Sequence, residues 1–382
     1  MPWRRVTILS EKQEFAHLAL KPDANISQLC SRFGISRKTG YKHIDRFISE
    51  GLEGLDERSR RPNSSPNQTP DAVEQEVIEM RKDHQAWGGR KIKRRLEDLG
   101  HESVPSPSTI TEILRRNHLL DESECEKHSP YQSFERECPN ELWQMDFKGA
   151  FATDTDSCHP LTVLDDHSRF DIVLRACGNE TTQTVKTALI EAFERYGLPE
   201  WMLMDNGSPW GVGPGQPYTV LTVWLIRLGV SVTHCRAYHP QTQGKDERFH
   251  GTLEAEVLRY RRFRGLEECQ REFDRWRRIY NFERPHEALN MSTPATRYQT
   301  SRRAYPSELP PIEYAPADTV RKVQQGGVIC FRGQEFRVGK AFTGYPVALR
   351  PALSDGLYNV FFCHQEVAHI DITKPKSGEA KV

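Results

Sequence analysis

The sequence predicts a multidomain protein with a central α/β core, all-α units before it and a small β-barrel after it. The chain has 382 residues, more than one ordinary core accommodates. Its apolar residues follow a helical period in the first third, mix strand and helix patterns in the middle, and form short strands near the end. Three stretches rich in Pro, Ser, Asn and charge, residues 56–70, 121–140 and 299–318, are predicted linkers between these regions.

Residues 1–55 are predicted to form a helix-turn-helix unit that binds DNA. One helix covers Ile26 to Phe33, Gly34 supplies a turn, and a second helix starts at Ser36. Such motifs present the start of the second helix to DNA bases and phosphates. The residues placed there are Ser36, Arg37, Lys38 and Lys42. Short helix pairs with a glycine turn also occur in proteins that never contact DNA, so the pattern alone leaves both interpretations open.

Residues 71–120 are predicted to form a second helical unit of helix-turn-helix type, with helices near 71–83, 89–99 and 107–117. The middle helix is strongly basic, as in GGRKIKRR, and it is a second candidate for DNA binding. Its candidate residues are Arg90, Lys91, Lys93 and Arg94. The alternative is a solvated helix face.

Residues 141–298 are predicted to form the core, a mixed sheet flanked by helices. Predicted strands cover 142–151, 159–170, 171–177, 199–207 and 230–235, and predicted helices cover 180–197, 219–229 and about 244–260. After the third linker, residues 319–375 show short alternating strands with Gly turns, which favour a small β-barrel.

Composition excludes several classes of protein. No window approaches the roughly 18 apolar residues of a membrane helix, and the N-terminus lacks a secretory apolar segment, so a cytoplasmic protein without a membrane partner is expected. The nine cysteines include no C-x-x-C pair, which argues against a disulfide framework or a zinc ribbon, and free buried thiols are expected. The 53 basic residues balance 53 acidic ones, so any nucleic-acid binding depends on local basic clusters.

Three acidic residues are candidates for a metal-dependent active site. Asp146 lies inside an otherwise apolar strand, Asp205 ends a strand before an Asn-Gly turn, and Glu247 lies near the start of a long helix. A carboxylate in an apolar strand is unfavourable unless a partner compensates its charge. A pair of Mg²⁺ or Mn²⁺ ions would do so and would suit phosphoryl transfer. Acids at strand ends also occur for purely structural reasons, so the pattern alone does not decide.

The sequence motifs around these acids resemble those of a known family. In order along the chain they are WQMDF, LTVLDDHSRF, MDNGSPW, YHPQTQGKDERFHGTLEAEV and YNFERPHEAL. They resemble the catalytic core of bacterial insertion-sequence transposases built like retroviral integrases, and the flanking helical and β regions extend the resemblance over nearly the whole chain. The resemblance implies a ribonuclease-H-like fold for the core and places the family's DDE triad on Asp146, Asp205 and Glu247. It also implies two Mg²⁺ or Mn²⁺ ions per site. Zinc is not expected, because the sequence shows no His and Cys cluster of the retroviral type.

The resemblance implies a mechanism and partners. Water attacks a phosphodiester at the end of the mobile element, and the freed 3′-hydroxyl attacks a second phosphodiester in a strand transfer. The partners would be double-stranded DNA, as terminal inverted repeats and target, and at least one further copy of the chain, because two ends must be joined. The protein would then be associated with the nucleoid. Two rivals stay open: a nuclease of the same fold that does not join strands, and a DNA-binding regulator with a decayed core.

Residues around the triad carry further expectations. Lys245 and Arg248 flank the glutamate and are expected to hold phosphates. Asp165 and Asp166 are expected to form a turn or to pair with Arg169. The spacing from Asp205 to Glu247 exceeds the family's usual one, and the excess falls in residues 210–218, a predicted surface insertion or DNA-contacting lid. The loop before the glutamate helix is expected either to cover bound DNA or to cap that helix; its residues are His239, Gln241 and Gln243. Four residues further along are expected to pack the core: Tyr280, Arg284, Pro285 and His286.

Overall fold

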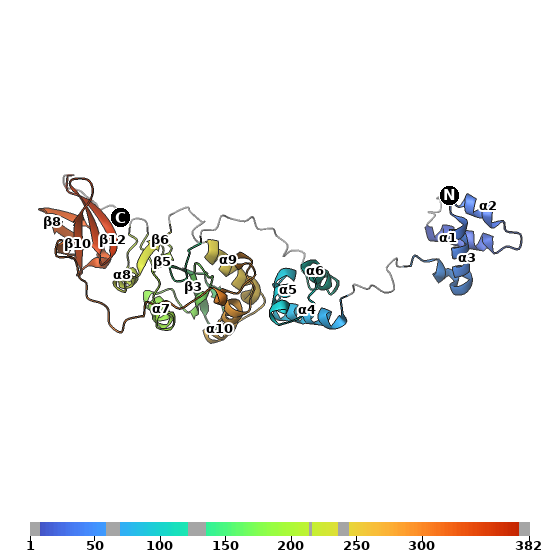
Figure 1. The fold of residues 1–382 in the computed structure, drawn as a ribbon, viewed down its shortest axis with the longest axis horizontal. Helices are drawn as coiled ribbons and strands as arrows, with labels where there is room; N and C mark the ends of the chain where they lie inside the picture. The colour runs from blue at the N-terminus through green and yellow to red at the C-terminus, as the bar shows by residue number, and fades with distance from the viewer. Residues whose placement is uncertain (1–7, 59–68, 121–134, 214–215, 236–243, 374–382) are drawn as a thin grey trace. The chain divides into compact units, whose positions relative to one another are not determined.

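The computed structural model describes residues 8–58, 69–120, 135–213, 216–235 and 244–373 (Figure 1). The chain divides into two compact units, Met1–Gln68 and Thr69–Val382. None of the helices in these described ranges combines the length and the apolar character that a bilayer crossing needs.

The first unit is a small helical domain. Its helices are α1 (Ile8–Ala19), α2 (Ile26–Arg32) and α3 (Arg37–Glu50), followed by a 3₁₀ turn η1 (Gly51–Leu55). The α2–α3 pair was predicted, whereas α1 was not. Phe15, Cys30 and Ile44 form the core. Gly40 on α3 permits the close approach, because a β-carbon there would lie 2.5 Å from the sulfur of Cys30.

The second unit begins with the three predicted helices, α4 (Asp71–Asp83), α5 (Gly89–Asp98) and α6 (Pro107–Arg116). They enclose a core that includes Trp87, Ile92 and Ile110, each fully buried. Gly89 allows α5 to meet α6, since a β-carbon would lie 2.4 Å from the carbonyl oxygen of Pro107.

The core is built on the predicted mixed sheet. The strand order is β2-β3-β1-β5-β6, and β4 pairs with the edge of β3 opposite to β1. The bounds are β1 (Leu142–Phe147), β2 (Phe151–Ala152), β3 (Ser157–Asp165), β4 (Asp171–Cys177), β5 (Trp201–Met204) and β6 (Ser231–His234). Strand β1 is central, since it pairs antiparallel with β3 and parallel with β5.

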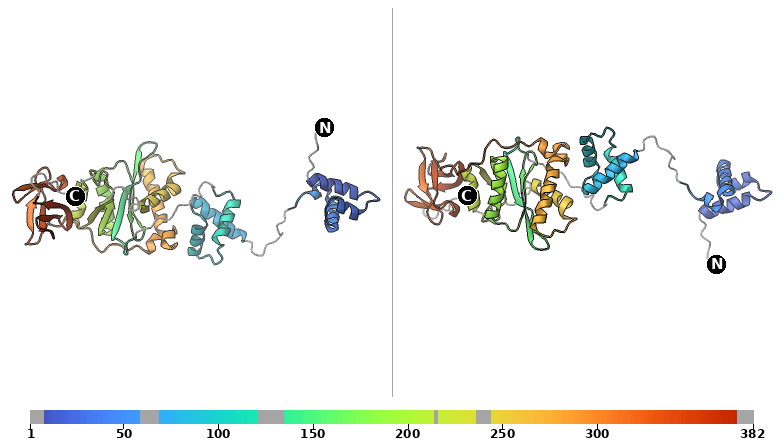
Figure 2. Two further views of the ribbon diagram at one scale, coloured as in Figure 1. Left: turned by 90° about the horizontal axis from the view of Figure 1, so that it is seen from above. Right: turned by 90° about the horizontal axis from the view of Figure 1, so that it is seen from below.

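Helices cover both faces of this sheet (Figure 2). On one face α7 (Thr182–Tyr196) and α8 (Val220–Arg227) share an apolar cluster with alternate residues of β1 and β3. On the other face lie α9 (Gly244–Leu253) and α10 (Leu266–Phe282). The predicted helix near 244–260 is thus shorter, because its second half is a π-helical segment, η4 (Glu254–Leu258). Helix α10 was not predicted. Two 3₁₀ turns follow it, η5 (Glu287–Leu289) and η6 (Pro294–Thr296).

The C-terminal module differs from the expected barrel. Its described strands form two sheets, one of order β12-β11-β10-β7 and one of β8 and β9. Gly326 and Gly327, both with positive φ, lie in the turn between β7, an edge strand of the larger sheet, and the β8–β9 hairpin. The bounds are β7 (Thr319–Lys322), β8 (Val328–Phe331), β9 (Gln334–Arg337), β10 (Pro346–Pro351), β11 (Leu357–Phe362) and β12 (Gln365–Asp371), with a 3₁₀ turn η7 (Lys340–Phe342) before β10.

Parts of the predicted linkers lie against the core. The side chain of Asn140 is buried and donates to the carbonyl oxygen of Gln299 at 2.7 Å. Leu198 donates its backbone N–H to the carbonyl oxygen of Arg303 at 2.7 Å. The ends of two predicted linkers therefore extend the core.

Candidate active site and DNA-binding residues

The sheet brings two of the predicted acids side by side. Asp146 lies near the end of β1, and Asp205 directly follows β5. In the parallel register Gln144 lies opposite Leu203, and two residues further along each strand the same register puts Asp205 next to Asp146. Backbone N–H groups orient both carboxylates, from Phe147 to Asp146 and from Gly207 to Asp205, each at 2.9 Å.

The third predicted acid lies on α9, which contacts β1. Glu247 is exposed, whereas its neighbour Asp246 is 1% exposed. The two carboxylates therefore point to different sides of α9, as the 100° rotation per residue predicts. Glu254 and Glu256, the other acids of this segment, are engaged elsewhere: Glu254 accepts from Lys148 at 2.6 Å, and Glu256 accepts from Arg284 at 2.8 Å.

Protein cations offset the negative charge at this site only weakly: among the described residues, Lys245 lies near Asp246, but it is paired with Asp166. Burial, and then the carboxylate of Asp205, raises the pKa of Asp146 to about 6, and Glu180 and Glu247 add smaller contributions. Burial, and then the charges of Asp146 and Asp166, raises the pKa of Asp246 well above its usual range. Neither carboxylate oxygen of Asp246 has a hydrogen-bond partner among the described residues. A buried group of acids with this little counter-charge is an arrangement that a divalent cation stabilises.

The donor set fits such a cation, although the site is not closed around one. Carboxylate oxygens are the donors that Mg²⁺ and Mn²⁺ prefer. Within the described ranges no three His, Cys, Asp or Glu side chains gather closely enough to hold an ion in this conformation. The side chain of Glu247 is exposed. The loop residues His239, Gln241 and Gln243 lie outside the described residues.

Asp165 and Asp166 form the predicted turn, and their carboxylates do not form an ion pair with the Arg169 side chain. Asp165 accepts from the backbone N–H of Ser168 at 2.8 Å, which closes the turn. Asp166 accepts from Gln144 at 2.7 Å and forms an ion pair with Lys245. Arg169 instead lies 3.5 Å from Glu135. Sequence proximity suggested the Arg169 pairing, but the left-handed backbone of Arg169 (φ 62°) follows the turn and its side chain meets Glu135, which is distant in sequence.

The predicted DNA-binding residues of α3 are exposed at its N-terminal half. Arg37, Lys38 and Lys42 have no ion-pair partner in the part of the chain that is described. Ser36 serves as the N-cap, and its hydroxyl accepts from the backbone N–H of Thr39 at 3.1 Å. The three cations are thus available to a phosphate backbone, whereas the Ser36 hydroxyl has a structural task.

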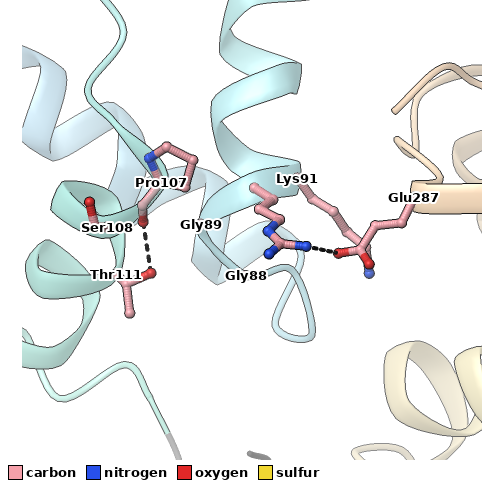
Figure 3. Close-up of a pocket in the computed structure, with 8 residues that line it drawn as sticks. Gly88, Gly89, Lys91, Pro107, Ser108, Thr111 and Glu287 are labelled. Atoms are coloured by element: carbon pink, nitrogen blue, oxygen red, sulfur yellow. Dashed lines mark hydrogen bonds and ion pairs between the residues drawn. The ribbon is translucent and has the colours of Figure 1, made fainter. Parts of the chain in front are cut away.

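Three of the predicted residues of α5 are already paired, and the fourth, Lys91, is half-buried. Arg90 lies 3.6 Å from Glu287 beside a pocket of about 300 Å³ at the start of α5 (Figure 3). Burial, and then the charge of Arg284, lowers the pKa of Lys91 to about 8. Lys93 and Arg94 pair along the helix with Glu97 and Asp98. Exposed pairs of this kind contribute roughly 0–1 kcal/mol, so phosphates can compete for Arg90 and Arg94.

The two cations that flank Glu247 differ. Lys245 is tied to Asp166, with its side chain only 13% exposed. Arg248 is exposed. Of the predicted packing residues, Tyr280 and His286 stack edge to face, and Arg284 pairs with Glu256.

Two contacts near the triad were not predicted. Thr162 lies opposite Asp146 on β3, and its hydroxyl meets His250 of α9 at 2.8 Å. Both are ordinary residues of their segments, and only the pairing of β1 with β3 brings them to the site, so nothing in the local sequence indicates the contact.

Family models match nearly every part of the chain. An integrase core domain matches residues 136–240 and again 228–294. A helix-turn-helix domain matches residues 11–63, a homeodomain-like domain matches 39–114, and the C-terminal domain of IS481 family transposases matches 318–378.

Similar proteins come from insertion elements and retroviruses. The uncharacterized 31.7 kDa protein of insertion element IS407 from Burkholderia multivorans is 24% identical over 250 residues, which are 64% of this chain and 87% of that protein. The uncharacterized 39.2 kDa protein of IS476 from Xanthomonas euvesicatoria is also 24% identical over 250 residues, 64% of this chain and 69% of that protein.

Two solved structures are also similar. The HTLV-2 integrase catalytic core in complex with magnesium (trimeric form) has a TM-score of 0.34 at 15% identity and covers 43% of this chain and 99% of its own. The simian T-cell lymphotropic virus intasome in complex with a PP2A regulatory subunit has a TM-score of 0.37 at 16% identity and covers 78% of this chain and 100% of its own.

The mixed sheet, the acids at its strand ends and the matched integrase core define a ribonuclease-H-like polynucleotidyl transferase of the DDE type. With its N-terminal helix-turn-helix domains, which bind DNA, and its IS481-type C-terminal domain, the chain belongs to the integrase-type transposases of insertion sequences.

Proposed function

We propose that this transposase cleaves DNA at the terminal inverted repeats of its insertion sequence and joins the freed 3′ ends to target DNA, with Asp146, Asp205 and Glu247 as its catalytic acids. The observation that carries the proposal is the group of uncompensated carboxylates where β1 and β5 end beneath α9. A structural role for Asp146 and Asp205 would call for a cationic partner, as Lys245 is for Asp166, whereas their hydrogen bonds among the described residues come from neighbouring backbone N–H groups.

The three carboxylates would hold Mg²⁺ or Mn²⁺, as two ions per site. When bound, the ions would stabilise the negative charge on the attacking and leaving oxygens. Asp146 and Asp205 would supply fixed oxygens, since backbone N–H groups orient both side chains. Glu247 would complete the set by side-chain rotation from its exposed position.

Recognition and positioning of DNA fall to other residues. Arg37, Lys38 and Lys42 would read and hold the inverted repeats, because they are exposed at the start of α3. Arg90 and Arg94 of α5 would exchange their carboxylate partners for phosphates. Arg248, one residue after Glu247, would position the scissile strand, and Lys245 would hold α9 to Asp166 instead. Joining two ends requires at least a dimer on DNA.

Charge-removing substitutions test the catalytic assignment. Asp146→Asn, Asp205→Asn and Glu247→Gln keep the side-chain shapes and should each eliminate cleavage and strand transfer on a substrate with both element ends, in Mg²⁺ and in Mn²⁺. Glu254→Gln is the matched control on the same helical segment, and it should retain substantial activity because the Glu254 carboxylate is engaged by Lys148. Melting curves and DNA-binding titrations should stay near wild type for all four variants.

Two outcomes would overturn the proposal. Near-normal turnover of Glu247→Gln together with loss in Glu254→Gln would move the third acid to Glu254. Cleavage without any joined product in the wild-type protein would indicate a nuclease of the same fold.

A further inference from the structure

We propose that Thr162 and His250 form a positioning clamp that fixes helix α9, and with it Glu247, relative to Asp146. The inference rests on the proposed function, because it matters only if these acids act together. The clamp joins three elements that are distant in sequence: β1, β3 and α9.

The first half of the clamp connects the two strands. Thr162 is fully buried and lies directly opposite Asp146 in the antiparallel pair. Its hydroxyl donates to the backbone carbonyl oxygen of Asp146 at 3.0 Å. A carbonyl oxygen only accepts, so this contact uses the single hydroxyl proton of Thr162.

The second half connects the strands to the helix. The Nε2 atom of His250 lies 2.8 Å from the Thr162 hydroxyl oxygen. Because that hydroxyl has already given its proton to Asp146, the imidazole must donate from Nε2. Burial, and then the nearby charge of Lys148, lowers the pKa of His250 to about 4, which agrees with a neutral ring at physiological pH.

The location of the clamp gives it a task that apolar packing does not perform. His250 is three residues after Glu247, about 4.5 Å along the helix axis at 1.5 Å per residue. Phe249 and Leu253 pack the same helix against an apolar cluster, but such contacts are non-directional and tolerate sliding. A hydrogen-bond chain that ends on the backbone of Asp146 fixes the register, and catalytic groups need placement to about 0.5 Å.

Matched substitutions separate the clamp from its surroundings. Thr162→Val removes the hydroxyl at nearly constant shape, and Thr162→Ser keeps it. His250→Leu removes the donor, and His250→Gln retains an N–H at similar reach. Thr222→Val is the control, because Thr222 is an equally buried hydroxyl on α8, on the opposite face of the sheet.

Three measurements are made on the full chain: Mn²⁺ binding by water-proton relaxation, the Mn²⁺ concentration for half-maximal strand transfer, and hydrogen exchange of α9 in the metal-free protein. We expect Thr162→Val and His250→Leu to weaken Mn²⁺ binding about tenfold, to raise the half-maximal Mn²⁺ concentration to match, and to speed exchange in α9. Thr162→Ser and His250→Gln should stay within about threefold of wild type, and Thr222→Val should lose stability without these changes. The double variant should be no worse than either single one, as expected for one shared interaction.

The clamp proposal is wrong if either Thr162→Val or His250→Leu binds Mn²⁺ and exchanges its α9 amide hydrogens as the wild type does. It is also wrong if Thr162→Ser weakens Mn²⁺ binding as much as Thr162→Val. If one variant fails to fold, the other decides alone. Asp146→Asn separates the two proposals. An active Asp146→Asn variant contradicts the proposed function, whereas an inactive one beside a normal Thr162→Val variant contradicts the clamp only.

Discussion

Asp171, the first residue of β4, is a buried acid outside the candidate active site. It is fully buried, and neither of its carboxylate oxygens has a hydrogen-bond partner among the described residues. The nearest cation, Arg277, lies 4.0 Å away. Burial raises the pKa of Asp171 to about 7, and the charge of Arg277 opposes the shift without cancelling it.

We predict that Asp171→Asn stabilises the protein in a pH-dependent way. A carboxyl whose folded pKa is raised favours folding below its unfolded pKa of about 4, and this contribution is lost as the pH rises through the folded value. The variant should therefore melt higher than wild type at pH 8 by about 2–4 °C, the shift for roughly 1 kcal/mol in a domain of about 150–250 residues, and show little gain near pH 4.

Asp166→Asn is the control for this prediction. Its carboxylate is equally buried but accepts from Gln144 and pairs with Lys245, so the substitution should lower the melting temperature. If Asp171→Asn melts at a lower temperature than wild type at pH 8, the Asp171 carboxylate must be compensated in the folded protein, and the prediction is wrong.

The positions of some single residues can be predicted from the sequence, and those of others cannot. Asp146 and Asp205 could be placed in and after neighbouring strands because local alternation and an Asn-Gly turn mark those positions. The Thr162–His250 contact could not, because it depends on strand register and helix docking. The same is true of the Arg169 side chain, whose partner Glu135 lies in a segment predicted to be a linker.

Among the secondary-structure elements, those with long apolar patterns were predicted best. Helices α4 to α8 and the sheet follow from residues that alternate with period 2 or recur every three to four positions. Helix α10 was missed although Cys269, Phe273, Trp276 and Tyr280 form a buried stripe, since dense charge between them obscures the pattern. The barrel was expected from short strands, but strand patterns do not specify whether a sheet closes.

Gln365 connects two of these elements, the edge strand β6 and the start of β12. Its side-chain amide accepts from the backbone N–H of Val232 and donates to the carbonyl oxygen of Val232, both at 2.8 Å. It therefore occupies backbone groups that an edge strand otherwise exposes. This contact joins the C-terminal module to the core, alongside Tyr218, whose ring packs against that of Phe342 at a tilt of 59°.

We predict that Gln365→Ala loosens this edge. Two backbone groups lose their partner, at about 1 kcal/mol for each hydrogen bond, so hydrogen exchange of β6 should accelerate several-fold while β1 is unaffected. Gln365→Glu should have an intermediate effect, because it keeps the acceptor for the N–H of Val232 and loses the donor. Gln334→Ala, which removes a side-chain contact inside the C-terminal module, should leave β6 unchanged. Unaltered exchange of β6 in Gln365→Ala would show that apolar packing alone holds the module.

For the whole molecule, the even charge balance makes local placement decisive. The chain has 53 basic and 53 acidic residues, so no general attraction draws it to DNA. Arg37, Lys38 and Lys42 of α3, which have no ion-pair partner in the described ranges, lie in the first compact unit, whereas Arg90, Lys93 and Arg94 of α5 are paired in the second. Specific binding should therefore depend strongly on the first unit and respond to salt.

We predict that removal of residues 1–120 abolishes preference for the element's ends while weak, metal-dependent nicking of arbitrary DNA remains, because base readout needs a helix in a groove. Removal of residues 1–68 alone should weaken the preference without destabilising the rest, since the chain divides there into compact units. The longer deletion also uncovers Ile279 and frees Glu283 from Arg95, so its melting curve is needed as a control. The measurement is competition binding between terminal repeats and scrambled DNA at several salt concentrations. If the chain without residues 1–120 still favours terminal repeats at physiological salt, the core or the C-terminal module must read the sequence.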